Sequence, residues 1–269
     1  MSNTSAMKDG VWMQTDDPHF LLRLATDELD LRAAQRLRYR VFVEELGGNG
    51  TLVDHDNRLE CDEFDPLFDH MILIDDRRDA AALDHVVGVY RLLRGDRAAK
   101  IGRFYTDSEY DLSALIASGK NLLELGRSCL HEDYRGGTAM LRLWSAVSQY
   151  VEDHDIDVLF GVASFHGTDI DALSGPLSLL HHKHLVPPEL YVRSKKYQPM
   201  NLMPDDRIDR VAAMRATPAL IKGYLRMGAR IGDGAFVDEA FNTTDVCLVM
   251  DMKAQSARHR AIYHERANV

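Results

Sequence analysis

Residues 122–151 constrain the fold of this chain more than any other segment, because a short apolar strand leads through a glycine pair straight into an amphipathic helix. The strand is expected at residues 122–130, and the helix follows from apolar residues at helical spacing, namely Met140, Leu143, Trp144, Val147 and Val151. The glycine pair, Gly136 and Gly137, comes just before the helix, whose free N–H groups would point at an anionic ligand. The segment therefore predicts an anion site at a strand–helix junction.

Two ionisable side chains, Glu124 and Arg127, lie inside the expected strand. A strand that should be buried rarely carries two charges, since buried charged groups are almost always paired. We therefore expect a charged pocket, and a place for chemistry, within a few residues of the anion site.

The rest of the chain alternates between strand and helix patterns in the way that is typical of an α/β fold, a mixed central sheet with helices on both faces. Strands are expected at 20–25, 70–74, 86–93, 122–130, 158–163, 229–237 and 245–252. Helices are expected at 29–46, 112–118, 140–151, 169–184, 206–214 and 218–227. We predict a flexible lead-in at 1–17, a single domain over 18–252 with a helical insertion at 185–228, and a tail at 253–269.

Composition limits the class of protein. The chain has 269 residues, of which 45% are hydrophobic, and this is enough for a sizeable core. A net charge of −10 argues against a nucleic-acid partner. Neither the three cysteines nor the histidines at 181–184 have metal-binding spacing, so no metal is expected. No apolar run reaches the roughly 18 residues that span a bilayer, so we expect a cytoplasmic protein.

The order of these elements is similar to that of the GNAT-type N-acyltransferases. In that fold the strand splays at a bulge, its backbone pairs with a pantetheine arm, and the following turn holds phosphate. The resemblance implies that the residues which bind the acyl thioester and pantetheine are Gly126, Ser128, Arg135, Gly136, Gly137 and Thr138. The alternative is an ordinary α/β turn that contains two glycines.

A more specific resemblance is to the acyl-homoserine-lactone synthases, which move an acyl chain from acyl carrier protein to an amine. It rests on residues 37–42 (Leu-Arg-Tyr-Arg-Val-Phe), residues 62–65 (Asp-Glu-Phe-Asp), Arg91 and residues 124–127 (Glu-Leu-Gly-Arg). The resemblance implies a catalytic set that consists of Arg38, Asp62, Asp65, Arg91, Glu124 and Arg127. Taken alone, Arg38 and Asp65 could equally form a plain surface pair.

The C-terminal third separates two related branches. Residues 218–229 and 238–246 resemble the ornithine-acyl-carrier-protein N-acyltransferases, and the likeness extends over residues 20–252. It implies transfer of a 3-hydroxyacyl chain from acyl carrier protein to the α-amine of ornithine, which gives a lyso-ornithine lipid. No permanently bound cofactor is implied, and the donor arm is the carrier's 4′-phosphopantetheine. Three alternatives stay open: glutamine or another amino acid as acceptor, an acyl-homoserine-lactone synthase, and a non-catalytic acyl-carrier-binding module.

The phosphate turn departs from the acetyltransferase pattern, which has small residues where this chain has Thr138 and Met140. Side chains there crowd a close approach of the backbone to phosphate. Tight binding of free coenzyme A, with its pyrophosphate, is therefore in doubt. The single phosphate of a carrier protein's pantetheine suits this turn better.

Amide formation requires a free amine, and an amino acid's α-amine is largely protonated near neutral pH. We expect Glu124 to act as the base, since burial tends to raise the pKa of a carboxylate. The alternative is a structural network with Arg38, Arg91 or Arg127. The backbone N–H groups of Arg127 and Ser128 could polarise the thioester carbonyl. Asp62 and Asp65 could attract ornithine's cationic side chain, or could belong to a solvated loop.

Positive charges gather after the strand expected at 86–93. Arg94, Arg97, Lys100 and Arg103 form a candidate docking patch for an acidic acyl carrier protein, with a solvated turn as the alternative. Arg193, Lys195 and Lys196 form a second candidate. The leucines of residues 173–190 could form a peripheral membrane face at the inner side of the plasma membrane, or could line an acyl tunnel.

Overall fold

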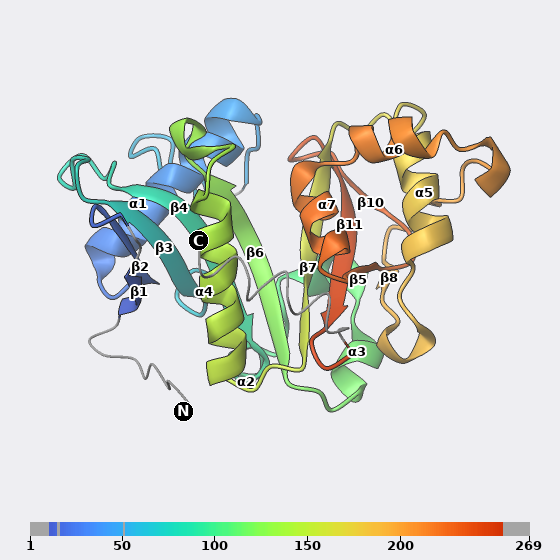
Figure 1. Cartoon of the computed structure of the whole chain (residues 1–269), viewed down its shortest axis with the longest axis horizontal. Coiled ribbons are helices and arrows are strands. Elements are labelled where there is room, and N and C mark those ends of the chain that lie inside the picture. The colour runs from blue at the N-terminus through green and yellow to red at the C-terminus, as the bar shows by residue number, and fades with distance from the viewer. Residues whose placement is uncertain (1–10, 15–16, 51, 255–269) are drawn as a thin grey trace. The chain divides into compact units, whose positions relative to one another are not determined.

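The computed structural model describes residues 11–14, 17–50 and 52–254, and their contacts divide them into two compact units. Unit 1 holds the described residues up to Leu93 together with 126–154, and unit 2 holds 94–125 and 155–254 (Figure 1). The chain passes from unit 2 into unit 1 within strand β6 (Leu122–Leu130), between Leu125 and Gly126.

Unit 1 contains strands in the order β1-β2-β3-β4, followed by the C-terminal half of β6. The pairs β1–β2, β2–β3 and β3–β4 are antiparallel. The elements are β1 (Val11–Gln14), β2 (Phe20–Leu24), α1 (Glu28–Arg38), the π-helix η1 (Tyr39–Glu45), β3 (Asp69–Asp75), β4 (Val86–Arg94), η3 (Glu132–Tyr134) and α4 (Ala139–Asp153).

Helices α1 and α4 pack on strands β3 and β4 through alternating residues. Ile72 and Ile74 join Ala33 and Leu37 of α1 in one buried cluster. Residues on the other side of these strands meet α4, where a Cβ added at Gly88 would lie 3.0 Å from Leu143. Because successive side chains of a strand point to opposite faces of the sheet, the same strand can pack against a helix on each face. This confirms the prediction of a sheet covered by helices on both faces.

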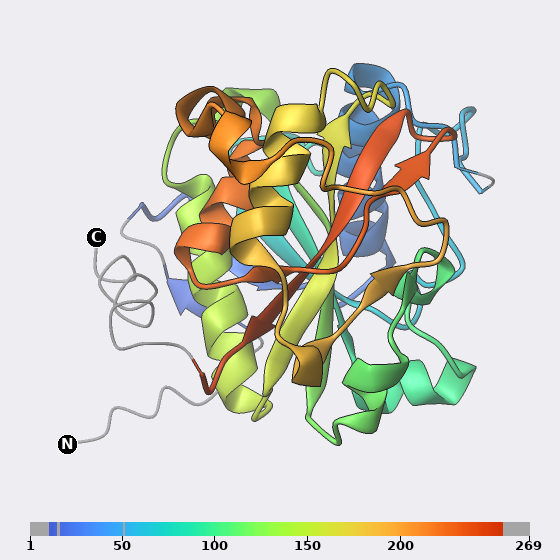
Figure 2. The same ribbon diagram turned by 90° about the vertical axis from the view of Figure 1, so that its right-hand side faces the viewer.

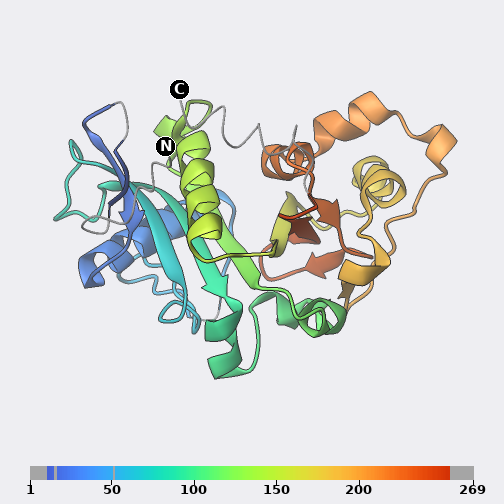
Figure 3. The ribbon, with the colours of Figure 1, turned by 60° about the horizontal axis from the view of Figure 1, so that its bottom comes forward.

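Unit 2 contains strands in the order β6-β7-β11-β10, with β9 also paired to β11. The β6–β7 pair is parallel, whereas the β7–β11 and β10–β11 pairs are antiparallel. Figures 2 and 3 show helices α5, α6 and α7 grouped on one side of these strands. The elements are α2 (Gly95–Ile101), η2 (Thr106–Ser108), β5 (Tyr110–Asp111), α3 (Ser113–Ala117), β7 (Val158–His166), α5 (Ser174–His184), η4 (Pro188–Leu190), β8 (Arg193–Ser194), η5 (Asp205–Arg207), α6 (Arg210–Ala216), α7 (Ala219–Arg226), β9 (Arg230–Ile231), β10 (Phe236–Asp238) and β11 (Thr243–Asp251).

Strand β6 leaves the regular extended conformation shortly after its parallel pairing with β7. The paired register runs from Leu122, opposite Val158, to Glu124, opposite Phe160. Three residues later Arg127 has a φ of 47°, which is unusual for a residue other than glycine and is the kind of distortion that a strand bulge produces. The bulge that the resemblance implied therefore has a counterpart in this backbone.

Some elements differ from the sequence prediction. Residues 11–14, assigned to a flexible lead-in, form β1, which pairs with β2. Helix α2 was not predicted, because only Ala98 of its seven residues is buried and no apolar stripe marks it. The strand expected at 229–237 is divided into β9 and β10. The tail from 255 onward lies outside the described residues.

Helix α5 begins later than predicted, at Ser174 rather than at 169. The Gly175-Pro176 pair lies in the first turn of this helix. Proline is tolerated there, because the first N–H groups of a helix have no partner within the helix. The dipeptide therefore marks the start of the helix.

Candidate functional site

A buried ion network in unit 1 begins at Arg38, the last residue of α1, whose side chain is fully buried. Its Nε donates to Oε2 of Glu60 at 2.5 Å, and its Nη1 donates to Oδ1 of Asp65 at 2.6 Å. Arg91 of β4 is equally buried, and its Nη1 donates to Oδ1 of Asp65 at 2.7 Å and to Oδ2 of Asp62 at 2.6 Å. Asp65 is therefore shared by two arginines.

Arg127 of β6 closes the network. Its Nε donates to Oε1 of Glu60 at 3.1 Å, and its Nη2 lies 3.5 Å from Oδ2 of Asp62. Three arginines thus meet three carboxylates, and their formal charges balance. The side chains of Arg127 and Asp62 are 15% and 16% exposed, while the other members are nearly inaccessible. The network therefore has one accessible end, formed by Asp62 and Arg127.

Mutual attraction keeps these groups charged despite their burial. Burial alone would raise the pKa of Glu60, but the nearby charges of Arg127 and Arg38 lower it to about 2. Asp65 is likewise buried, yet Arg38 and Arg91 hold its pKa well below the usual range. Burial and the other two arginines lower the pKa of Arg91. A buried ion pair is stable only when its charges are compensated in this way, and removal of one partner typically costs about 3–5 kcal/mol.

Four neutral neighbours hold the network in place. Gln35, three residues before Arg38 on α1, donates its Nε2 to Oδ2 of Asp65 at 2.9 Å. The ring of His70 donates from Nε2 to the backbone carbonyl of Asp65 at 2.9 Å. Two guanidinium groups lie over aromatic rings. The guanidinium carbon of Arg91 is 4.4 Å from the ring centroid of Phe68, and that of Arg127 is 5.8 Å from the ring centroid of Phe42.

The structure brings together five of the six residues expected to be catalytic: Arg38, Asp62, Asp65, Arg91 and Arg127. The Arg38–Asp65 contact is a buried one, so the surface-pair alternative does not hold. Sequence reasoning missed Glu60, which lies two residues before Asp62 in a segment interpreted as loop. It also missed Gln35, although its spacing of three from Arg38 placed both on one helix face.

Glu124, the sixth residue, belongs to unit 2, where it is 1% exposed. Its Oε2 accepts a hydrogen bond from the backbone N–H of Tyr105 at 2.9 Å, and its Oε1 accepts one from Thr106 at 2.6 Å. Both oxygens of the carboxylate are therefore fixed by backbone amides.

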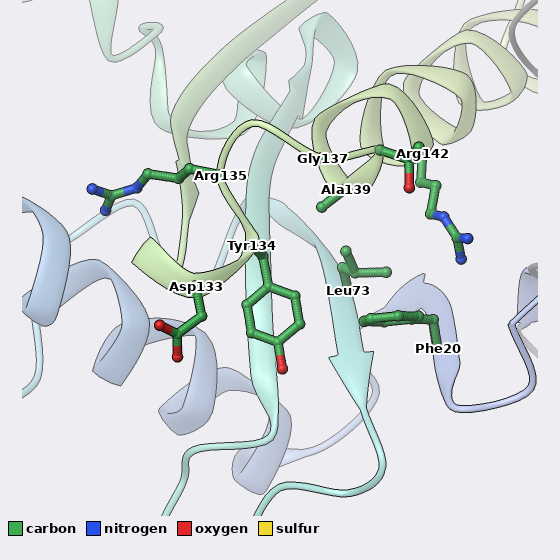
Figure 4. A pocket seen from close by; sticks show the side chains of 9 residues that line it. Phe20, Leu73, Asp133, Tyr134, Arg135, Gly137, Ala139 and Arg142 are labelled. Carbon is green, nitrogen blue, oxygen red and sulfur yellow. The ribbon is translucent and has the colours of Figure 1, made fainter.

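A pocket of about 200 Å³ lies at the N-terminus of α4, beside the turn that was predicted to bind phosphate. Gly137 and Thr138 line it, together with Tyr134 and Phe20 (Figure 4). The predicted phosphate ligand Arg135 lines it only in part, because its Nη2 donates to the carboxylate of Glu45 at 2.9 Å and to a backbone carbonyl. Arg135 therefore lines the pocket while its guanidinium is bonded to groups outside the pocket lining.

Other predicted binding residues fall on the same turn or on β6. Gly136 adopts a φ of 78°, which favours glycine, and Gly126 has open space where a Cβ would stand. The hydroxyl of Ser128 is buried and has no hydrogen-bond partner among the described residues. This leaves the hydroxyl able to contact a ligand.

The basic residues expected to dock a carrier protein lie on or beside α2. Lys100 and Arg103 are exposed, whereas Arg94 and Arg97 are half-buried, and Arg94 pairs with Asp96 at 3.0 Å. The second candidate patch is engaged locally, since Arg193 lies over the ring of Tyr197 and Lys196 over that of Phe236, while Lys195 donates to the carbonyl of Asp107.

Burial of the leucines bears on the expectation of a membrane face or acyl tunnel at 173–190. Leu177, Leu179 and Leu180 of α5 are buried within unit 2, so these leucines do not form an exposed apolar face. Among residues 11–14, 17–50 and 52–254, no helix has both the length and the apolarity to cross a membrane.

Unit 2 also contains an acidic group outside these sets. Glu109, Asp238 and Asp245 each bring a carboxylate oxygen within 4.8 Å of the others, a spacing that a cation could bridge. Two tyrosines of the same unit, Tyr191 and Tyr197, both donate their hydroxyls to Asp233.

A family model described as "Acetyltransferase (GNAT) domain" matches residues 37–145, which include the ion network and all of the pocket lining except Phe20. Two solved structures share the fold at a TM-score of 0.50. The acyl-homoserine lactone synthase LasI is 15% identical, over 92% of this chain and 95% of that chain, and the coenzyme-A-dependent synthase BjaI is 14% identical, over 89% and 82%. The family model and these two structures thus show a fold of the GNAT type.

Sequence relatives narrow the class. A protein of Rhodobacter capsulatus named L-ornithine N(alpha)-acyltransferase is 60% identical over 91% of this chain and 95% of its own length. A protein of the same name from Brucella abortus is 41% identical over 92% and 89%. The chain belongs to the L-ornithine N(alpha)-acyltransferase family, as the sequence resemblance implied.

The buried ring of His70 should make folding stability depend on pH. Burial and the charge of Arg38 lower its pKa to about 4, compared with 6.5 in an unfolded chain. Between these values the unfolded chain binds a proton that the folded chain does not, so stability falls as pH falls from 6.5 to 4. The variant His70→Gln keeps an N–H for the Asp65 carbonyl but does not titrate.

We expect urea unfolding at pH 7 and pH 4.5 to show a smaller loss of stability in His70→Gln than in the native chain, by on the order of 2 kcal/mol. Acid destabilisation that remains below pH 4.5 belongs to carboxylates such as Glu60. Equal losses in the two proteins would show that His70 does not govern this window.

Proposed function

We propose that this protein transfers a 3-hydroxyacyl chain from acyl carrier protein to the α-amine of L-ornithine and so forms a lyso-ornithine lipid. The observation that carries the proposal is 60% identity, over nearly the full length of both chains, to a protein named for ornithine acylation. The charge-balanced network of Arg38, Arg91 and Arg127 with three carboxylates supports it, because it provides a polar site for a charged amino acid.

The phosphate turn supports a carrier protein, rather than coenzyme A, as donor. Thr138 and Met140 replace the small residues that let a backbone approach a pyrophosphate closely. The pocket of about 200 Å³ is below the 300–1,000 Å³ that is typical of sites for drug-sized ligands. One phosphate with its flanking carbons suits this volume better than a whole nucleotide does.

We assign attraction of the ornithine ammonium groups to Asp62 rather than to Asp65. Asp65 is 4% exposed, and Arg38, Arg91 and Gln35 occupy its oxygens. Asp62 lies at the accessible end of the network. Its carboxylate can therefore face a substrate while it stays paired with Arg91.

The reaction then has three steps, namely deprotonation and attack by the amine, stabilisation of the oxyanion, and departure of the thiolate. A base removes a proton from the α-ammonium group, and the free nitrogen attacks the thioester carbon to form the C–N bond. The backbone N–H groups of Arg127 and Ser128 stabilise the oxyanion that develops on the carbonyl oxygen. The attacking nitrogen loses its second proton, the C–S bond breaks, and the pantetheine thiolate leaves and takes up a proton to become the thiol. We assign the base to Glu124, which acts directly or through a water molecule.

We also propose that the carrier protein docks on the basic residues beside α2. Carrier proteins are strongly acidic, and Lys100 and Arg103 present exposed positive charges in a chain whose net charge is −10. Such docking should weaken with salt, because exposed charges are screened over about 10 Å at 0.1 M ionic strength.

The proposal is tested with purified protein, 3-hydroxyacyl carrier protein or the corresponding acyl-coenzyme A, and each amino acid in turn. Mass spectrometry should find the acyl-amino acid with ornithine and carrier-bound donor, at a rate that falls as salt rises. A preference for glutamine would change the acceptor, and a lactone signal from S-adenosylmethionine would indicate a synthase. Absence of thiol release with every amino acid would indicate a non-catalytic carrier-binding module.

Replacement of Glu124 by glutamine tests its role as base. A general base typically contributes 10²–10⁴ in rate, so Glu124→Gln should lower kcat by about that factor at pH 7. The loss should shrink at a pH above the pKa of the substrate amine, where a free amine no longer needs a base. Rates measured from pH 6 to pH 10 check this.

The glutamine variant also places an NH₂ group against the N–H of Tyr105 or Thr106, which costs about 1–3 kcal/mol of stability. Circular dichroism and urea unfolding of Glu124→Gln and Glu124→Ala therefore accompany the rates. Full activity of a folded Glu124→Gln, with loss only in Glu124→Ala, would contradict the base assignment and leave Glu124 a structural role.

A further inference from the structure

The pocket at the N-terminus of α4 contains an arginine that the sequence analysis did not single out. Arg142 lines this pocket, and its guanidinium carbon lies 5.2 Å from the ring centroid of Phe20, another lining residue. Its Nη1 is buried and has no hydrogen-bond partner in the part of the chain that the structure describes. A buried N–H group without an acceptor is costly, so the Nη1 of this half-buried side chain is a ready donor to an anion.

The helix itself adds donors at the same place. Helix α4 has 15 residues, and Thr138, its N-cap residue, makes no side-chain hydrogen bond to the first turn. The first backbone hydrogen bond runs from the N–H of Arg142 to the carbonyl of Thr138, so the N–H groups ahead of it are available to an anion. Long helical side chains lean toward the N-terminus, and this brings Arg142 back over the first turn.

Two neighbouring arginines, Arg135 and Arg77, are already bonded to carboxylates. Arg135 points to the opposite side of the turn from Arg142 (Figure 4) and bonds to Glu45 and to the carbonyl of Leu130. Arg77 shares the ring of Phe20 with Arg142 but forms a two-point ion pair with Asp75. Of these three cations, Arg142 is the one without an acceptor.

Negative charge at the pocket is limited. Asp133 lines it, but its side chain is 67% exposed, and its Oδ2 lies 3.5 Å from His131 and 3.7 Å from Arg78. Tyr134 donates its hydroxyl to Asp75, so its phenol presents no donor to a ligand. An anion would therefore meet the helix N-terminus and Arg142 together.

We propose that Arg142, rather than Arg135, binds the phosphate of the donor's pantetheine arm at this pocket. The inference rests on the proposed function, because the phosphate belongs to the acyl donor. It also accounts for Thr138 and Met140 in the turn. The acetyltransferase pattern has small residues there, which let backbone N–H groups approach a phosphate, and in this chain the guanidinium of Arg142 would bind the phosphate instead. In this proposal the pocket binds the donor through its one phosphate, and β6 binds the thioester end of the donor.

The test compares two donors that differ only in this phosphate, acyl-4′-phosphopantetheine and acyl-pantetheine. In the native protein the phosphate should lower the donor KM. The variant Arg142→Gln should raise KM for acyl-4′-phosphopantetheine roughly 10–100-fold, which corresponds to the loss of one charge-assisted hydrogen bond. Its KM for acyl-pantetheine and its kcat should stay close to the native values. Arg142→Lys should recover part of the loss.

Two matched variants decide between explanations. Arg77→Gln removes a charge over the same Phe20 ring, and it should keep the KM difference between the two donors. Arg135→Gln tests the rival ligand: loss of that difference in this variant, with its retention in Arg142→Gln, would overturn the proposal. An equal rise in KM for both donors in Arg142→Gln would also overturn it, since only a structural role does that.

Binding of acyl-4′-phosphopantetheine, measured by calorimetry without any amino acid, separates this inference from the proposed function. Binding that weakens 10–100-fold in Arg142→Gln supports the inference even if ornithine proves not to be the acceptor. Unchanged binding would contradict it even if ornithine is acylated.

Discussion

The buried network of three arginines and three carboxylates is the interaction on which unit 1 depends. Its members come from α1, the segment at 60–65, β4 and β6, so they meet only when all four have packed together. Each charge would be expensive alone in the interior, where an uncompensated ion costs several kcal/mol. The network therefore fixes where α1 ends, how 60–65 folds back, and where the β6 bulge places Arg127.

The same network divides into a buried part and an accessible end. Arg38, Arg91 and Asp65 are buried from solvent and paired with one another. Because the two arginines lower the pKa of Asp65, these charges stay constant over a wide pH range. Asp62 and Arg127 lie at the accessible end, where a substrate charge can be added without breaking the buried pairs. Glu124 is held differently, by hydrogen bonds from two backbone amides to its carboxylate oxygens.

Much of this was predictable from the sequence, because apolar periodicity locates strands and helices and a charge inside an apolar strand indicates a site. Glu124 and Arg127 were singled out in that way, and the family resemblance supplied Asp62, one of the two carboxylates beside Arg127. Glu60 escaped, since a carboxylate in a polar segment has no periodic pattern to mark it. Side-chain direction was also beyond the sequence: Arg135 matched the phosphate motif yet turns to Glu45, while Arg142 looked like an ordinary surface residue of a helix.

The central claim, that the charges act as one compensated unit, is tested most directly by a double-mutant cycle on Arg38 and Glu60, measured by urea unfolding at pH 7. Arg38→Met alone should cost about 3–5 kcal/mol, because it leaves buried carboxylates uncompensated. The double variant Arg38→Met with Glu60→Gln should cost less than the sum of the two single variants, by roughly 1–3 kcal/mol. Strict additivity of the two losses would contradict the account.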